Sequence, residues 1–163
     1  MTVRIISIDP GYDRCGVALV TIHKGIPSLE SSQCIVTKKS DSHSTRLAHI
    51  FSSIEILVKE WQPTHIAIET LFFSVNKTTA LKVAEARGAI MTLAGLHTIP
   101  IIELSPQEVK LAMTGNGSAT KEQVQKMVRI SLKLDTGKLL DDEIDAIAVG
   151  FAATGALRVA AWG

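Results

Sequence analysis

The chain has 163 residues, of which 46% are apolar and 20% are charged, and its formal net charge is only +1. A chain of this length can bury about 70% of its unfolded surface, and its apolar content excludes an intrinsically disordered protein. We therefore expect residues 1–163 to form a single domain. No apolar run approaches the roughly 18 residues of a membrane span, and the apolar run before Asp9 is too short for a secretion signal. We expect a cytoplasmic protein.

The first half of the chain predicts three strands, a helix and a fourth strand. β-Branched runs predict strands over residues 3–9, 15–22 and 29–37, with Gly25-Ile26-Pro27 as the turn between the second and third. Apolar residues at helical spacing predict an amphipathic helix that begins at Ser42 or Ser44 and ends at Trp61. A strand over residues 64–69 follows.

The second half predicts a helix over residues 77–96, a strand over 100–104 and three further helices. Ser105 is a good N-cap, because Pro106 occupies the first helical position and Glu108 the third, and this helix should reach about residue 113. Thr120 and Gln123 form a second capping box for a helix over 120–134, and the last helix spans 141–160. This order predicts an α/β fold, a five-stranded mixed sheet with helices on both faces.

Three separate segments each place carboxylates where an element begins or ends. The run Ile5-Ile6-Ser7-Ile8 leads to Asp9 and then to the turn Pro10-Gly11, and the apolar run 65–68 leads to Glu69. At the start of the last helix, Asp142 and Asp145 are three residues apart and share a face, but Asp141 and Asp145, four apart, would share one too. The helix geometry does not choose between Asp141 and Asp142.

Carboxylates that converge from two strand ends and a helix repel one another unless a hard cation neutralises them. Sites made of carboxylate oxygen suit Mg²⁺ or Mn²⁺, and two such ions can stabilise the attacking and leaving oxygens of a phosphodiester displacement. Setting aside Asp9, Glu69, Asp142 and Asp145 as metal-neutralised changes the remaining net charge from +1 to +5. A basic surface beside an acidic metal site suits a polyanionic substrate.

The sequence resembles the RuvC Holliday-junction resolvases, a family of the RNase H-like (retroviral integrase) superfamily. The resemblance covers nearly the whole chain and rests on the order and spacing of short motifs that are weak individually. They are Ile8-Asp9-Pro10-Gly11, Ala67-Ile68-Glu69 with Phe72, Ala86-Arg87-Gly88, Val109-Lys110, Gly117-Ser118-Ala119 with Lys121, and Asp142-x-x-Asp145-Ala146.

This resemblance implies an RNase H-like fold and a homodimer that makes symmetric paired nicks in four-way DNA junctions during recombination and repair. It implies Mg²⁺ as cofactor, two ions per site, with Mn²⁺ as a substitute. The catalytic and metal-binding residues it implies are Asp9, Glu69, Asp142 and Asp145, so it selects Asp142 over Asp141. It further implies branch-migration proteins as partners.

The same resemblance implies DNA contacts by Phe72, Lys110 and Lys121. An aromatic ring just past a strand end can stack on an unstacked base, worth about 1–3 kcal/mol, whereas ordinary core packing is the alternative for Phe72 and Phe73. The resemblance favours a DNA contact for Phe72 alone. It assigns nothing to Tyr12, Asp13 or Arg14, and we assign no role to Cys15 and Cys34, which lack a metal-binding or redox spacing.

Two kinds of alternative remain. The first is an RNase H-like nuclease that acts on another nucleic acid, and the second, from a different class, is a noncatalytic junction-binding protein, although all four carboxylates are present. Asp9-x-Gly11 followed by Gly16 also resembles the phosphate turn of actin-like ATPases, but these need two such domains.

The helix over residues 77–96 has little polar face after its first two turns. Such a helix must be covered on more than one side. It is either an internal helix of a larger core or a subunit interface, and a domain of this size has little room to enclose one.

Overall fold

The computed structural model describes residues 2–71, 77–132 and 139–160. It contains one sheet of five strands in the order β3-β2-β1-β4-β5. The strands are β1 (Val3–Asp9), β2 (Arg14–His23), β3 (Ile26–Val36), β4 (His65–Glu69) and β5 (Ile101–Leu104). β1 pairs antiparallel with β2 and parallel with β4, so the sheet is mixed, as predicted.

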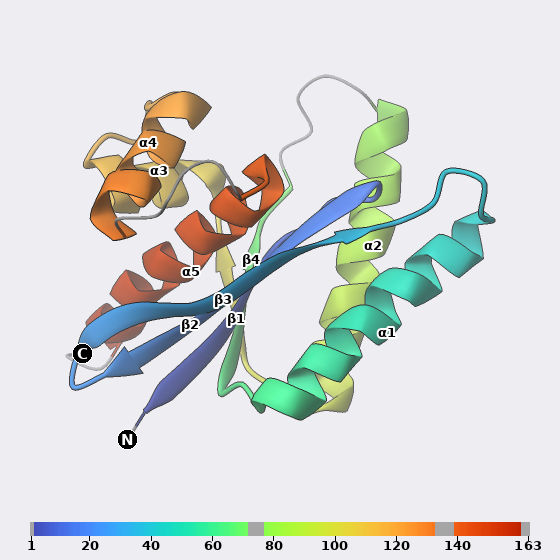
Figure 1. Ribbon diagram of the computed structural model, residues 1–163, viewed down its shortest axis with the longest axis horizontal. Helices are drawn as coiled ribbons and strands as arrows, with labels where there is room; N and C mark the ends of the chain where they lie inside the picture. Colours follow the sequence, from blue (N-terminus) through green and yellow to red (C-terminus); the bar gives the residue numbers. More distant parts are fainter. Residues whose placement is uncertain (1, 72–76, 133–138, 161–163) are drawn as a thin grey trace.

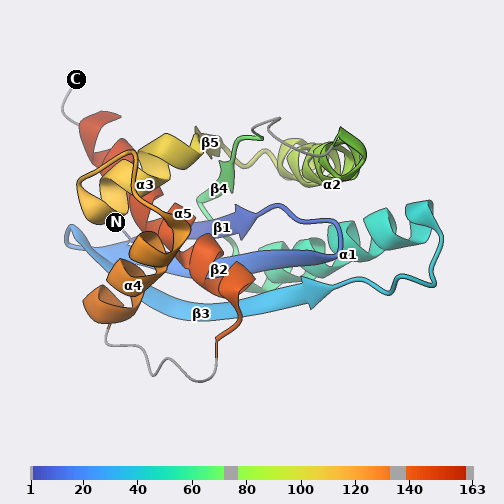
Figure 2. The same ribbon diagram turned by 90° about the horizontal axis from the view of Figure 1, so that it is seen from above.

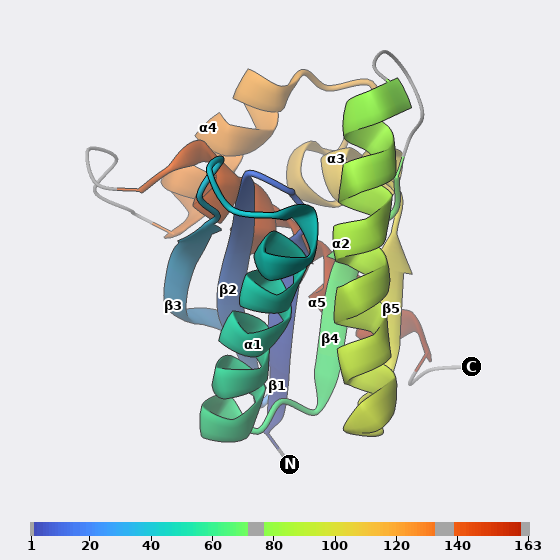
Figure 3. The same cartoon turned by 90° about the vertical axis from the view of Figure 1, so that its right-hand side faces the viewer.

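The helices lie on both faces of this sheet, which confirms the predicted architecture. They are α1 (His43–Trp61), α2 (Lys77–Leu96), α3 (Pro106–Thr114), α4 (Lys121–Leu132) and α5 (Asp141–Ala160). Figure 3 shows α1 and α2 side by side over one face. Figures 1 and 2 show α5 on the other face, with α3 and α4 beside it.

Strand alternation explains the two cores. Ile6 and Ile8 of β1 pack with Ile50 of α1 on one face, whereas Ile5 packs with Ile147 of α5 on the other. Both groups are fully or almost fully buried. Successive strand residues point to opposite faces, so a central strand between two helical layers must be apolar on both.

The predicted helix starts are confirmed in detail. Ser42, one of the two predicted candidates, caps α1 and accepts from the backbone N–H of Thr45. Ser105 and Glu108 form the predicted capping box of α3, with Pro106 in its first turn. At α4, the backbone N–H of Thr120 donates to Gln123 at 2.8 Å. Local capping chemistry was thus readable from the sequence.

The predicted turn Gly25-Ile26-Pro27 is wrong: the observed turn starts one residue earlier and ends two residues earlier. The turn consists of Lys24 and Gly25, both with positive φ, and β3 already begins at Ile26. Two residues of positive φ make the kind of tight hairpin turn that matches the strand twist. Pro27 fits within β3 because β3 is an edge strand, where a missing N–H is tolerated.

Within the part of the chain that the structure describes, none of the helices combines the length and apolarity that crossing a membrane requires.

Candidate active site

The end of the central strand pair carries two of the predicted carboxylates. β1 and β4 are parallel neighbours in which Ile8 lies beside Ile68, so the next residues, Asp9 and Glu69, end their strands side by side. Ile5 and Ala67 face the core beneath α5. Asp9 and Glu69 lie an even number of residues further along, so alternation directs them to the same face.

Two glycines allow α5 to approach this face closely. A Cβ on Gly16 of β2 would lie only 1.9 Å from the carbonyl oxygen of Asp142, and one on Gly150 of α5 would lie 2.6 Å from Oγ of Ser7. Either side chain would force the helix away from the sheet. The absence of these two side chains therefore sets the depth of α5, and with it the position of the acids in its first turns.

Asp9, Glu69 and Asp145 line one cleft, with a volume of about 240 Å³. Lys110 of α3 and Lys121 of α4 line it as well. The remaining walls are Pro106, Val109, Val124, Ala148 and Val149. Three carboxylates and two lysines that are distant in the sequence therefore share one pocket. The convergence of the carboxylates follows the strand-end argument, whereas the two lysines were expected only from the family resemblance.

The carboxylates in this cleft disfavour one another's ionised form. Burial, followed by the charges of Asp145 and Glu69, raises the pKa of Asp9 from 3.8 to about 7. Burial and then Asp145 raise the pKa of Glu69, while Lys121 and Lys110 oppose the rise. With three carboxylates and two lysines, the fully ionised cleft would carry a net negative charge, which favours a bound cation.

Asp145 has two partners on α4. Nζ of Lys121 lies 2.5 Å from its Oδ2, and Nε2 of the buried Gln125 donates to its Oδ1 at 3.2 Å. Burial alone would lower the pKa of Lys121, but Asp145, with Asp9 and Asp141, raises it. Gln125 was not predicted as a site residue, because nothing in its spacing distinguishes it from other helix positions.

Asp142 does not line the cleft. Its Oδ2 lies 2.6 Å from Nη2 of Arg14, at the start of β2. Its charge still reaches Asp9, whose pKa it helps to raise. Arg14 received no role from the sequence, since only the fold reveals that the first residue of β2 faces the first turn of α5.

The neighbouring acids of α5 behave differently. Asp141 is exposed and lies outside the cleft lining. Glu143 is buried, and its carboxylate accepts from Oγ of Ser32 at 2.9 Å and from the backbone N–H of Leu140 at 3.0 Å. Glu143 thus ties the start of α5 to β3 and to Leu140, the residue just before the helix.

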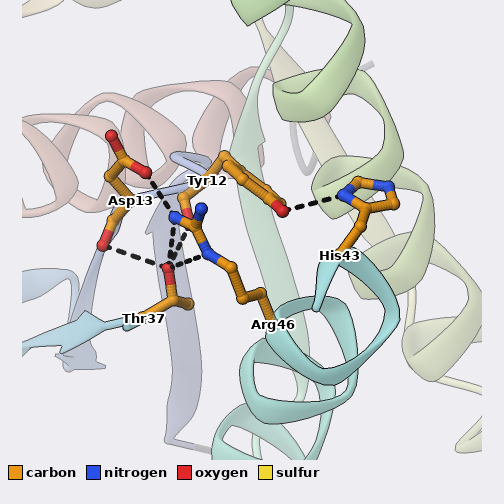
Figure 4. A network of polar contacts seen from close by, with 5 residues as sticks. All are labelled: Tyr12, Asp13, Thr37, His43 and Arg46. Carbon is orange, nitrogen blue, oxygen red and sulfur yellow. Dashed lines mark hydrogen bonds and ion pairs between the residues drawn. The ribbon is translucent and has the colours of Figure 1, made fainter. Parts of the chain in front are cut away.

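The loop that follows Asp9 is fixed by a polar network (Figure 4). The guanidinium of the buried Arg46 lies 3.8 Å from the ring centroid of Tyr12 and donates to Oγ1 of Thr37 at 2.9 Å. Thr37 donates in turn to the carbonyl of Tyr12 at 2.8 Å, and Arg46 also pairs with Asp13. The network joins the loop to β3 and α1.

This network extends to α2. The hydroxyl of Tyr12 and Nδ1 of His43 are 2.8 Å apart, and Nε2 of His43 lies 2.9 Å from Glu85 of α2. Tyr12 and Asp13, to which the sequence assigned nothing, thus anchor the turn behind Asp9. The loop cannot move freely without breaking contacts to three other elements.

The predicted DNA-contact residue Phe72 lies outside the described residues. Among the described residues, no three His, Cys, Asp or Glu side chains are grouped closely enough to hold a metal ion.

The two cysteines are free, and burial raises the pKa of the Cys15 thiol to about 12.

The RuvC family model, described as crossover junction endodeoxyribonuclease RuvC, matches residues 5–153 of this chain. A relative of that name from Brachyspira hyodysenteriae is 40% identical over 147 residues, which cover 90% of this chain and 91% of the relative. Another, from Moorella thermoacetica, is 43% identical over 146 residues, which cover 89% of this chain and 87% of that relative.

A solved structure, Thermus thermophilus RuvC in complex with Holliday junction substrate, superposes with a TM-score of 0.88 at 26% identity. The match covers 97% of this chain and 96% of that one. The yeast mitochondrial Holliday junction resolvase Ydc2 shares the fold at a TM-score of 0.67 and 13% identity. The similarity therefore extends through the whole fold that builds the cleft.

Proposed function

This chain belongs to the RuvC family of crossover junction endodeoxyribonucleases, and on that basis we propose how its cleft works. The enzyme hydrolyses phosphodiesters in four-way DNA junctions by symmetric paired nicks, in recombination and repair. The observation that carries the proposal is the cleft itself, where Asp9, Glu69 and Asp145 meet Lys110 and Lys121. Acids that need a cation beside lysines that can bind phosphate form a site for a polyanion.

The family is metal-dependent, and the donor chemistry of the cleft, carboxylate oxygen, suits a hard divalent cation. The described carboxylates are not grouped as closely as a bound metal requires, so metal binding would draw them together. The cleft acids Asp9, Glu69 and Asp145 are all carboxylates, and burial followed by the charges of Asp145 and Glu69 raises the pKa of Asp9, so a cation bound beside them would favour its ionised form. We propose that Asp9, Glu69 and Asp145, joined by Asp142, hold Mg²⁺, two ions per site, with Mn²⁺ as a substitute. Bound there, such ions supply stabilisation of the attacking and leaving oxygens of the phosphodiester.

The chain's own side chains position the substrate. Lys110 and Lys121 bind the DNA backbone and hold the scissile phosphate over the carboxylates. Gln125 and Lys121 together fix the orientation of Asp145, because they bind its two oxygens from the same side of α4. The network of Tyr12 and Arg46 keeps the turn behind Asp9 in place. Phe72 remains our candidate for stacking on an unpaired base near the cleavage step.

We propose that the described elements belong to one nuclease domain that acts as a homodimer through α2. One face of α2 packs on the sheet through Ala86, Ile90 and Leu93. Outside that face, Leu81 and Leu96 are exposed at 62% and 71%, and Gly88, which lies between them in the sequence, is exposed as well. A two-fold symmetric junction is cut at symmetric positions most simply by two sites related by a two-fold axis.

The proposed activity also bears on the cellular compartment of the enzyme and on its protein partners. An enzyme that acts on chromosomal DNA works in the compartment that holds it, so we propose a cytoplasmic location. A branch-migration protein that moves the junction remains a predicted partner.

The direct test uses a synthetic four-way junction and a linear duplex of matched sequence, each incubated with the full chain in Mg²⁺ and in EDTA. We expect symmetric nicks in the junction in Mg²⁺ alone. Junction binding without any cleavage would identify a noncatalytic binding protein instead. Preferential cleavage of an RNA–DNA hybrid would identify a different nuclease.

A further inference from the structure

One of the four predicted carboxylates is held apart from the others. Asp9, Glu69 and Asp145 line the cleft, whereas Asp142 does not and pairs with Arg14 at 2.6 Å. Both partners are only partly buried, with 44% of the Arg14 side chain and 26% of the Asp142 side chain exposed. The pair can therefore open without burying an unpaired charge.

The pairing follows from the register between β2 and α5. Gly16 faces α5, where the carbonyl of Asp142 fills the space of its missing side chain. Arg14 precedes Gly16 by two residues, so it lies on the same face of the strand. The side chain of Arg14 consequently extends beside the first turn of α5 and reaches Asp142. Any change that moved α5 outward would break this contact.

We propose that Arg14 is a positioning residue: it is an internal counterion that holds Asp142 away from the cleft and competes with the metal for it. The inference rests on the proposed function, in which Asp142 is a metal ligand. Before Asp142 can bind metal, it must leave or share the guanidinium. Arg14 therefore weakens metal binding in the DNA-free enzyme, because the carboxylate of Asp142 stays paired with the guanidinium.

Arg14 differs in this respect from Lys121, which also pairs with an acid of α5. Lys121 lines the cleft and can reach bound phosphate, so its removal changes both charge and substrate contact. Arg14 is outside the cleft lining, and its effect on metal should pass through Asp142. A double-mutant cycle between Arg14 and Asp142 therefore isolates the part of the effect of Arg14 on metal affinity that depends on Asp142.

The test measures Mn²⁺ affinity of the full chain without DNA, by calorimetry, for wild type, Arg14→Gln, Asp142→Asn and the double variant. We expect Arg14→Gln to tighten Mn²⁺ binding about two- to fivefold, the range of a partly exposed ion pair. Asp142→Asn should weaken binding. In the Asp142→Asn background, Arg14→Gln should change the affinity much less, and Arg14→Lys should bind Mn²⁺ more weakly than Arg14→Gln.

Two results would overturn the inference. Equal effects of Arg14→Gln with and without Asp142 would mean that only long-range charge is at work. An unchanged Mn²⁺ affinity in Asp142→Asn would remove Asp142 from the metal ligands and Arg14 from its role. Junction cleavage by the wild-type chain, measured in parallel, tests the proposed function separately. Thermal unfolding in EDTA verifies that each variant is folded.

Discussion

The ammonium group of Lys121 lies 2.5 Å from Oδ2 of Asp145, so this lysine of α4 forms one wall of the acidic cleft. Lys121→Ala should slow junction cleavage in Mg²⁺. If Lys121 neutralises a duplex phosphate, the slope of log affinity against log salt should also flatten by about 0.9. Lower activity with an unchanged slope would mean that Lys121 acts on Asp145 rather than on DNA. No effect on either would remove it from the site.

Lys110→Ala tests the second lysine of the cleft in the same two assays. Lys110 has no ion-pair partner among the described residues, so loss of a phosphate contact is the expected result, again with a flatter salt slope of about 0.9. Lys59→Ala is the matched control. Lys59 pairs with Glu55 on α1, on the other face of the sheet, and its removal should leave both measurements unchanged.

Removal of a carboxylate charge should separate cleavage from binding. Asp9→Asn, Glu69→Gln and Asp145→Asn each keep the side-chain volume and should abolish cleavage in Mg²⁺ while junction binding persists. Gel-shift and nicking assays on the same junction measure the two properties. Asp141→Asn serves as control, since Asp141 is exposed and lies outside the cleft lining, and it should cleave normally. A substituted residue that retained near-normal turnover would leave the catalytic set.

The sequence predicted the fold and most of the cleft because the signals that carry them are local. The strand that ends in Asp9, the capping box of Ser105 and the alternation of β1 depend on neighbouring residues only. Asp9 and Glu69 could be expected to converge, since each follows an apolar strand-like run, but the parallel pairing of β1 with β4 is known only from the fold. In the last helix, the spacing placed Asp145 on one face together with either Asp141 or Asp142.

The parts that the sequence missed depend on register between distant elements. Arg14 meets Asp142, and Gln125 meets Asp145, only because α5 lies at a particular depth and angle on the sheet. The apolar sequence of α2 likewise did not predict which face of the helix packs on the sheet. Ala86 is 0% exposed within the protomer, whereas Gly88, two residues later on the same helix, is exposed. No spacing rule within one helix could have distinguished these faces.

The raised pKa of Asp9 predicts an unusual pH dependence of stability in the absence of metal. Between pH 3.8 and about 7, folded Asp9 keeps a proton that the unfolded chain has already lost. The native state then binds more protons, so the free energy of unfolding falls as pH rises through this window. Each pKa unit corresponds to about 1.4 kcal/mol, and the total should reach a few kcal/mol above pH 7.

Asp9→Asn should remove this penalty. In EDTA, urea unfolding should find the variant more stable than wild type at pH 8, with the difference shrinking toward pH 4. The remaining pH dependence of the variant reflects the other groups with shifted pKa values, among them Glu69, whose pKa is also raised. Parallel curves for the two proteins over this range would show that the pKa of Asp9 is not raised in the folded protein.

The exposed face of α2 gives the sharpest test of the proposed dimer. A Cβ at Gly88 would meet no atom within 4 Å inside the protomer. Gly88→Glu should therefore leave the fold intact and even favour the helix by up to about 1 kcal/mol. At a two-fold interface the same carboxylate would be buried unpaired and would cost several kcal/mol of association. Light scattering should then detect monomers, and paired nicking should fall.

Gly155→Glu is the matched control, because Gly155 is also helical, lies on α5 and has open space around it. It should remain dimeric and cut both strands. Ala86→Glu would be unsuitable as a test, because Ala86 is buried against the sheet and the substitution would disrupt the core beneath α2 rather than an interface. If Gly88→Glu stays dimeric with normal paired cleavage, the α2 interface is wrong. If the wild-type chain is monomeric at micromolar concentration and still makes coordinated nicks, the symmetry argument is wrong as well.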